Sequence, residues 1–129
     1  MINFMEVTQV ISRSSKCCRL QVGAVIVKEG RIISTGYNGL PSGYNDSICN
    51  KNCEGCEETI HAEMNAILFA AKKGIATEGA TLYTTHAPCT NCAKHILNSG
   101  IKEVIYLNDY RSMKGVELLL NNNIGVIKE

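Results

Sequence analysis

Two short motifs in this sequence combine residue types that can bind zinc and move protons. His61-Ala62-Glu63 supplies an imidazole and a carboxylate, and Pro88-Cys89-Thr90-Asn91-Cys92 supplies two thiols. A tetrahedral zinc held by three protein ligands keeps a fourth position for water, and a carboxylate that is not a ligand can carry the proton of that water. The motifs therefore predict a catalytic zinc site with the imidazole and both thiols as ligands and the carboxylate as general acid and base.

The spacing of the two cysteines suits a single ion. Cys89 and Cys92 are three residues apart, so in the first turn of a helix they lie about 60° apart on the helical wheel and both can reach one metal. Pro88 suits a helix start, and the positive end of the helix dipole favours thiolates. Since His61 opens another predicted helix, we expect the ion to lie where two helix ends converge.

A C-x-x-C pair alone is a weak signal, because in an intracellular chain it can be a redox pair or half of a structural zinc knuckle. The combination of His-x-Glu with Pro-Cys-x-x-Cys is the signature of zinc deaminases, which favours deamination of an aminopyrimidine. Neither of the other two histidines is predicted as a ligand: His86 lies beside the site and shapes the pocket, and His95 is an ordinary packed or surface residue.

Length and composition predict one domain over residues 1–129, with 45% hydrophobic and 19% charged residues. The net charge of +1 and the scattered basic residues offer no footprint for nucleic acid.

Without an apolar run of roughly 20 residues or a signal-like N-terminus, the protein is expected in the cytoplasm, away from membranes. Seven clustered cysteines fit metal binding in a reducing compartment.

Hydrophobic periodicity predicts helices that alternate with strands after a first hairpin, hence a mixed sheet covered on both faces. A polar loop over residues 36–58 precedes the helix that carries the histidine motif. The predicted helices span residues 4–11, 60–73, 88–98 and 112–121, and the predicted strands span 22–27, 32–35, 80–85, 103–107 and 125–127.

Four segments make the chain resemble the deoxycytidylate (dCMP) deaminase branch of the cytidine deaminase-like superfamily. They are CCRLQVGAVIV at 17–27, IISTGYNGLPSG at 32–43, HAEMNAI at 61–67 and PCTNC at 88–92. The G-Y-N-G-x-P-x-G loop is typical of the branch, and the zinc motif of the whole superfamily. The resemblance implies an α/β fold, a three-layer α/β/α sandwich with a central five-stranded mixed sheet, and conversion of dCMP and water to dUMP and ammonia for dTTP synthesis.

The resemblance also implies how the substrate is held. Asn38 is expected to contact the sugar hydroxyl, and backbone groups near Ala62 and Pro88 to hold the pyrimidine edge. Arg19 is the first candidate for the phosphate. Ordinary surface charge is the alternative for Arg19 and the favoured interpretation of three weaker candidates: Lys72, Arg111 and Lys114.

Regulation and assembly follow from the resemblance alone. Many members of this branch are homohexamers that dCTP activates and dTTP inhibits, with the effectors near the subunit contacts and the segment Gly36-Tyr37-Asn38-Gly39. The same properties are therefore expected of this chain.

A second group of cysteines precedes the catalytic helix. Some phage-type members hold a structural zinc that joins the end of the first helix to this loop. Four thiols here could form such a site, although free or partly buried thiols are the alternative. The predicted ligands are Cys17, Cys49, Cys53 and Cys56, with Cys18 as a substitute for Cys17.

Two other functions remain open. A tRNA adenosine deaminase, or another nucleoside or nucleotide deaminase, shares the zinc motif, but an RNA-binding enzyme would want a more basic surface. A non-catalytic, zinc-stabilised nucleotide-sensing module would have no need of Glu63 beside the metal.

Overall fold

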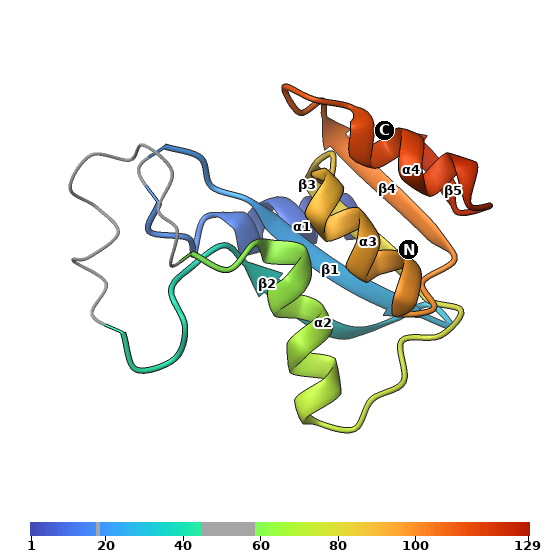
Figure 1. Cartoon of the computed structure of the whole chain (residues 1–129). Helices are drawn as coiled ribbons and strands as arrows, with labels where there is room; N and C mark the ends of the chain where they lie inside the picture. Colours follow the sequence, from blue (N-terminus) through green and yellow to red (C-terminus); the bar gives the residue numbers. More distant parts are fainter. Residues whose placement is uncertain (18, 45–58) are drawn as a thin grey trace.

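Helices and strands alternate along most of the chain (Figure 1). The computed structural model describes residues 1–17, 19–44 and 59–129. The elements are α1 (Phe4–Ser12), β1 (Gly23–Lys28), β2 (Arg31–Tyr37), α2 (Ala62–Lys72), β3 (Thr81–His86), α3 (Thr90–Asn98), β4 (Glu103–Asn108), α4 (Lys114–Asn121) and β5 (Gly125–Lys128).

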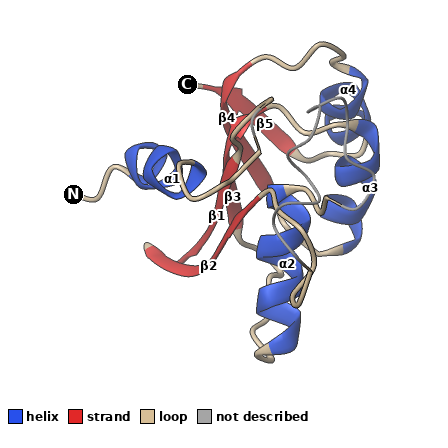
Figure 2. Cartoon of the chain, turned by 90° about the vertical axis from the view of Figure 1, so that its left-hand side faces the viewer, coloured by secondary structure: helices blue, strands red, loops and turns tan. Residues whose placement is uncertain are grey.

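The strands form one mixed sheet in the order β2-β1-β3-β4-β5. The pairs β1·β2 and β1·β3 are antiparallel, whereas β3·β4 and β4·β5 are parallel and are connected through α3 and α4. Among the described helices, α1 covers one face of the sheet and α2, α3 and α4 cover the other (Figure 2). The predicted three-layer α/β/α sandwich with a five-stranded mixed sheet is therefore confirmed.

A two-residue turn joins the first two strands. Glu29 and Gly30 have φ angles of 53° and 74°, the pair of positive values that a type I′ hairpin turn needs. The predicted hairpin is confirmed, and its strands pair up to Lys28 and from Arg31 because the turn is tight. β2 is therefore longer than predicted, whereas β1 has the predicted length and lies one residue later.

The main core lies between the sheet and the three-helix layer. Ile26, Leu82 and Val104 occupy paired positions on three adjacent strands, and all are fully buried. Each such side chain contributes roughly 1.5–3 kcal/mol through burial. This row fixes the register of the strand ends, where the functional residues lie. The helices contribute Ala62, Ala66, Ala93, Ile96 and Leu119 to the same core.

Gly36 brings α2 into direct contact with β2. A Cβ at this position would lie 2.5 Å from the Ala62 carbonyl oxygen and 2.5 Å from the Ala66 backbone nitrogen. The prediction that a loop starts at residue 36 is wrong: β2 continues through Tyr37, because Gly36 pairs with Ala24 under the helix. Backbone contact thus positions the helix that carries the histidine motif.

None of the helices in the described segments is both long and apolar enough to cross a bilayer.

Candidate active site

The three predicted metal ligands come from the starts of two helices. His61 is the N-cap of α2, and Cys89 is the N-cap of α3, with Cys92 in its first turn. The predicted helix start at Pro88 is wrong by two residues. The Cys89 sulfur accepts a hydrogen bond from the Cys92 backbone N–H at 3.5 Å, so Cys89 caps the helix and Pro88 precedes it.

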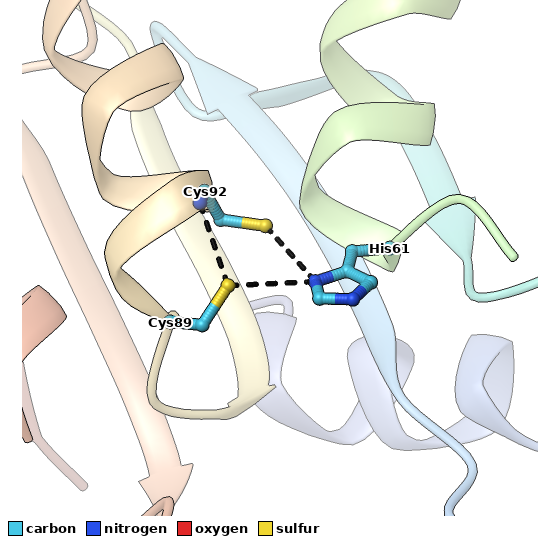
Figure 3. Close-up of side chains that lie close together, drawn as sticks. All are labelled: His61, Cys89 and Cys92. Atoms are coloured by element: carbon cyan, nitrogen blue, oxygen red, sulfur yellow. Dashed lines mark hydrogen bonds between the residues drawn. The ribbon is translucent and has the colours of Figure 1, made fainter. Parts of the chain in front are cut away.

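The ligand atoms are arranged as zinc requires (Figure 3). His61 Nδ1 lies 3.3 Å from Cys92 Sγ and 3.5 Å from Cys89 Sγ, and both sulfurs point to the imidazole ring. Zinc bonds of about 2.3 Å to sulfur and about 2.0–2.1 Å to nitrogen, at tetrahedral angles, separate sulfur from nitrogen by about 3.5 Å. One His and two Cys with this spacing therefore fit a zinc ion, with Nδ1 as the nitrogen ligand.

Hydrogen bonding already favours ionisation of one of the two cysteines. The contact with Cys92 is the main cause that lowers the pKa of Cys89 to about 3, whereas the same contact raises the pKa of Cys92. The hydrogen bond with Cys89 also raises the pKa of His61. Zinc needs thiolates and an unprotonated Nδ1, so metal binding releases the remaining protons.

Glu63 lies in the first turn of α2, two residues after the imidazole ligand, and only 4% of its surface is exposed. Burial in the protein raises the pKa of this carboxyl group to about 7. A pKa near neutrality suits a residue that must both accept and donate a proton during one turnover. The structure therefore places a buried carboxyl group with a raised pKa beside the predicted metal site.

A pocket of about 560 Å³ opens over the metal ligands. His61, Glu63 and Cys89 line it, together with residues from the segment before β1 and from the ends of β3 and β4. The volume is sufficient for a small ligand of nucleotide size. The pocket residues outside the zinc motifs include Arg19, Val22, Asn38, His86, Asn108, Asp109, Tyr110 and Arg111.

Two of the four predicted phosphate-binding cations reach this pocket. Arg19 and Arg111 line it, but Lys72 near the end of α2 and Lys114 at the start of α4 are not among its described lining residues. Arg111 is only a weak phosphate candidate in the sequence analysis, because no sequence pattern indicates that it lies near the pocket. The structure brings it close through the loop after β4, where its guanidinium lies 5.5 Å from the Tyr110 ring.

The end of β4 and the loop after it are hydrogen-bonded to the strands on both sides. The Asn108 side chain donates to the Thr85 carbonyl at 3.0 Å, and Asp109 pairs with Lys128 at 3.1 Å. Sequence reasoning missed Asn108, Asp109 and Tyr110 as pocket residues. A usable signal existed, because β4 runs parallel to β3 and the carboxyl ends of adjacent parallel strands meet at the same edge of a sheet.

Asn38 lines the pocket and is 7% exposed. Its Oδ1 accepts from the Val22 N–H at 2.9 Å, and its Nδ2 donates to the Leu20 carbonyl at 2.8 Å. The Ser15 hydroxyl donates to the Asn38 carbonyl at 2.9 Å. These bonds hold the segment that carries Arg19, and within the described part of the chain they use one of the two amide hydrogens of the side chain.

The two expected pyrimidine-binding positions differ in their surroundings. Ala62 lines the pocket. Pro88 is fully buried between the pocket residues Ala87 and Cys89, and its carbonyl oxygen faces α4, 2.3 Å from where a Cβ of Gly115 would lie. Sequence reasoning gave no role to Gly115, although a glycine early in a predicted helix was a signal of close packing.

The remaining sequence predictions concern other cysteines and histidines. Cys17 is half-buried and lines the pocket, but Cys18, Cys49, Cys53 and Cys56 lie outside the described residues, so the second zinc site stays a prediction. His95 is exposed on α3, where its Nδ1 lies 2.6 Å from the Asn91 carbonyl oxygen, whereas His86 lines the pocket.

Comparison with known proteins identifies relatives over most of the chain. A family model described as "Cytidine and deoxycytidylate deaminase zinc-binding region" matches residues 2–108. The chain is 37% identical, over an alignment 161 positions long, to the deoxycytidylate deaminase of Enterobacteria phage T4, covering 92% of this chain and 83% of that protein. It is 46% identical over 112 residues to ComE operon protein 2 of Bacillus subtilis, covering 84% of this chain and 59% of that protein.

The fold comparison agrees with the sequence comparison. The dCMP deaminase of cyanophage S-TIM5 matches in its apo form with a TM-score of 0.86 and 36% identity, over 98% of this chain and 94% of that one. The same enzyme in complex with dCMP and dUMP matches with a TM-score of 0.87 and 35% identity, over 98% and 93% of the two chains.

Proposed function

Because this chain belongs to the dCMP deaminase family of the cytidine deaminase-like superfamily, we propose that it hydrolyses dCMP to dUMP and ammonia. The proposal rests on one observation: a single pocket combines the residues for deamination with cations for a phosphate, and a deoxynucleotide deaminase needs both. His61, Cys89 and Glu63 line it, with Cys92 grouped beside the first two, and Arg19 and Arg111 offer positive charge for a phosphate.

The chemistry divides between the metal and the protein. Zinc bound to His61, Cys89 and Cys92 would supply a Lewis acid that activates water at neutral pH. Glu63 accepts a proton from the attacking water and delivers it to N3 of the pyrimidine. It then carries the second water proton to the amino group on C4, the C4–N bond breaks, and ammonia leaves as the C4 carbonyl forms.

The other pocket residues orient the nucleotide in this proposal. The backbone near Ala62 and Pro88 contacts the pyrimidine edge, and the side-chain amide of Asn38 contacts the sugar hydroxyl. Arg19 and Arg111 bind the 5′-phosphate, since guanidinium groups match phosphate oxygens in charge and geometry.

Replacing Arg19 or Arg111 with Ala is expected to raise the KM for dCMP by about 10- to 100-fold, the usual effect of losing a hydrogen bond to a charged group. The KM for deoxycytidine, which has no phosphate, should change by less than about threefold. Steady-state kinetics with both substrates measures the difference.

Lys72→Ala is the matched control, because it removes a cation outside the described pocket lining. It should leave both KM values unchanged. Equal losses on dCMP and deoxycytidine in the Arg19 variant would reject the phosphate assignment for that residue.

An absorbance assay with dCMP, CMP, deoxycytidine and a short RNA hairpin tests the proposed substrate directly. We expect the highest kcat/KM for dCMP. Turnover of the RNA alone would favour the tRNA adenosine deaminase alternative, and no turnover of any pyrimidine would favour the nucleotide-sensing module.

Regulation by dCTP and dTTP and assembly into a homohexamer belong to the same proposal. The segment Gly36-Tyr37-Asn38-Gly39 supports effector binding through its resemblance, and the exposed Leu68 and Phe69 on α2 offer an apolar surface for another subunit. Sigmoidal dCMP kinetics that become hyperbolic with dCTP, together with a hexamer mass by light scattering, are the expected results. Rates insensitive to both nucleotides would remove the regulatory part.

A further inference from the structure

His86 lies in the middle of a row of pocket residues at one end of the sheet. The row consists of Asn38 after β2, Val22 before β1, His86 at the end of β3 and Asn108 at the end of β4. The Asn38 N–H donates to the Val22 carbonyl at 3.2 Å, and His86 pairs with Asn108 in the parallel ladder. The Gly23 N–H donates to Thr85 Oγ1 at 3.1 Å, which joins the start of β1 to the end of β3.

This row places His86 between the two strand ends that lead to the arginines of the pocket. Arg19 is three residues before Val22, and Arg111 is three residues after Asn108. The two segments adjoin the strands on either side of β3, and both line the same pocket. Asp109, the acidic residue of the second segment, is paired with Lys128, so its charge opposes an anion in the pocket less strongly.

The hydrogen bonds of Thr85 favour one of the two tautomers of His86. Thr85 Oγ1 accepts the Gly23 N–H and lies 3.0 Å from His86 Nδ1, and Thr85 is only 3% exposed. A hydroxyl has one hydrogen to donate, and Nδ1 is its partner among the described residues. Donation of this hydrogen to Nδ1 satisfies the buried hydroxyl, and we therefore assign Nδ1 as the acceptor and the hydrogen of the neutral imidazole to Nε2.

The charge state of His86 agrees with this assignment. Burial lowers its pKa, which favours the neutral ring at physiological pH. Among the described residues Nε2 has no hydrogen-bond partner, so its N–H is available to a ligand in the pocket.

We propose that His86 is a specificity-determining residue whose Nε2–H donates a hydrogen bond to the 5′-phosphate of a nucleotide held between Arg19 and Arg111. The inference deepens the proposed function and rests on it. The phosphate is the favoured acceptor because both neighbouring segments bring guanidinium groups, and its oxygens accept without needing a donor in return. The two cations attract a phosphate through its charge, and the neutral N–H adds a hydrogen bond with a defined direction. Together they select a phosphate by its position as well as by its charge.

Two substitutions distinguish the contribution of the Nε2 donor from that of the Nδ1 contact with Thr85. In His86→Gln the side-chain amide extends to about the position of Nε2, so the donor is kept, and in His86→Asn it extends only to that of Nδ1. We expect kcat/KM for dCMP to fall by about 10-fold or more in His86→Asn and by less than about threefold in His86→Gln. The corresponding values for deoxycytidine should fall by less than about threefold in both variants.

His95→Asn is the control, because this exposed histidine bonds only within its own helix among the described residues. Equal losses of both His86 variants on both substrates would overturn the proposal by indicating a packing role. A loss that disappears with 2′,3′-dideoxycytidine monophosphate would overturn it in favour of a contact to the sugar hydroxyl.

A spectroscopic test is independent of turnover. Nitrogen NMR of zinc-loaded protein labelled at histidine should show His86 with hydrogen on Nε2, and this signal should shift with dUMP but not with deoxyuridine. The opposite tautomer, or no shift with dUMP, would overturn the proposal. If wild-type protein binds dUMP with this signature but does not turn over dCMP, the proposed function fails while the inference about His86 stands.

Discussion

Replacement of Glu63 by Gln is expected to lower kcat for dCMP by about 1000-fold or more, with zinc content and thermal stability little changed. A positioned proton carrier contributes about 100- to 10,000-fold to a rate, and Glu63 serves several transfers in one turnover. Gln has the same shape but cannot exchange a proton. Absorbance kinetics and metal analysis on the same preparation measure the two quantities.

The control for this variant is Glu117→Gln, which removes a carboxylate from the exposed first turn of α4. It should retain full activity. If Glu63→Gln keeps more than about a tenth of the wild-type rate, another group carries the protons, and Asp109 is the next carboxylate in the pocket. If Glu63→Gln loses zinc instead, the role of the carboxylate is to hold the site together.

The fold was largely predictable because its strands and helices have strong local signals. β1 and β3 are runs of β-branched and apolar residues. The type I′ turn at Glu29 and Gly30 is recognisable in the sequence by its glycine. Prediction failed mainly at boundaries, since these depend on tertiary contacts. β2 extends through Gly36 only because α2 packs against that glycine.

The metal ligands and Glu63 were predictable for a different reason. They form two short motifs, each at the start of a helix, where spacing decides which atoms within the motif can share a site, and the combination of the two motifs is a known signature. The phosphate side of the pocket gives no such signal. Arg19 and Arg111 are 92 residues apart in the chain and line one pocket because of the order of the strands. The charge of Arg111 therefore looks like ordinary surface charge until β4 is placed beside β3.

The contact at Gly115 shows how a residue outside the pocket can control the metal site. It is the second residue of α4, and a Cβ there would lie 2.3 Å from the Pro88 carbonyl oxygen and 2.8 Å from the Cys89 carbonyl oxygen. Both atoms belong to the backbone that leads into the ligand helix. An added methyl group therefore has to displace either α4 or the segment that positions the Cys89 sulfur.

Gly115→Ala is accordingly expected to weaken zinc binding by about 10-fold or more and to lower kcat in parallel. Its effect on stability has two opposing parts. Ala in place of Gly within a helix stabilises by roughly 0.5–1 kcal/mol, whereas overpacking against a rigid neighbour costs typically about 1–3 kcal/mol. Since the atoms in contact are backbone, the steric cost should prevail and Tm should fall. Zinc competition with a chromophoric chelator and thermal unfolding of the zinc-loaded protein measure both effects.

Gly125→Ala is the matched control, because the nearest atom to a new Cβ there is 3.7 Å away, an ordinary contact at the start of β5. It should keep the zinc affinity and activity of the wild type. A Gly115→Ala variant with wild-type zinc affinity and a raised Tm would mean that α4 retreats without moving the loop, so that helix propensity governs the result. Unchanged zinc affinity with a lowered Tm would mean that the strain stays within α4. Only the combined loss of affinity and stability identifies the packing of α4 against Pro88 and Cys89 as the support that holds the metal ligands in place.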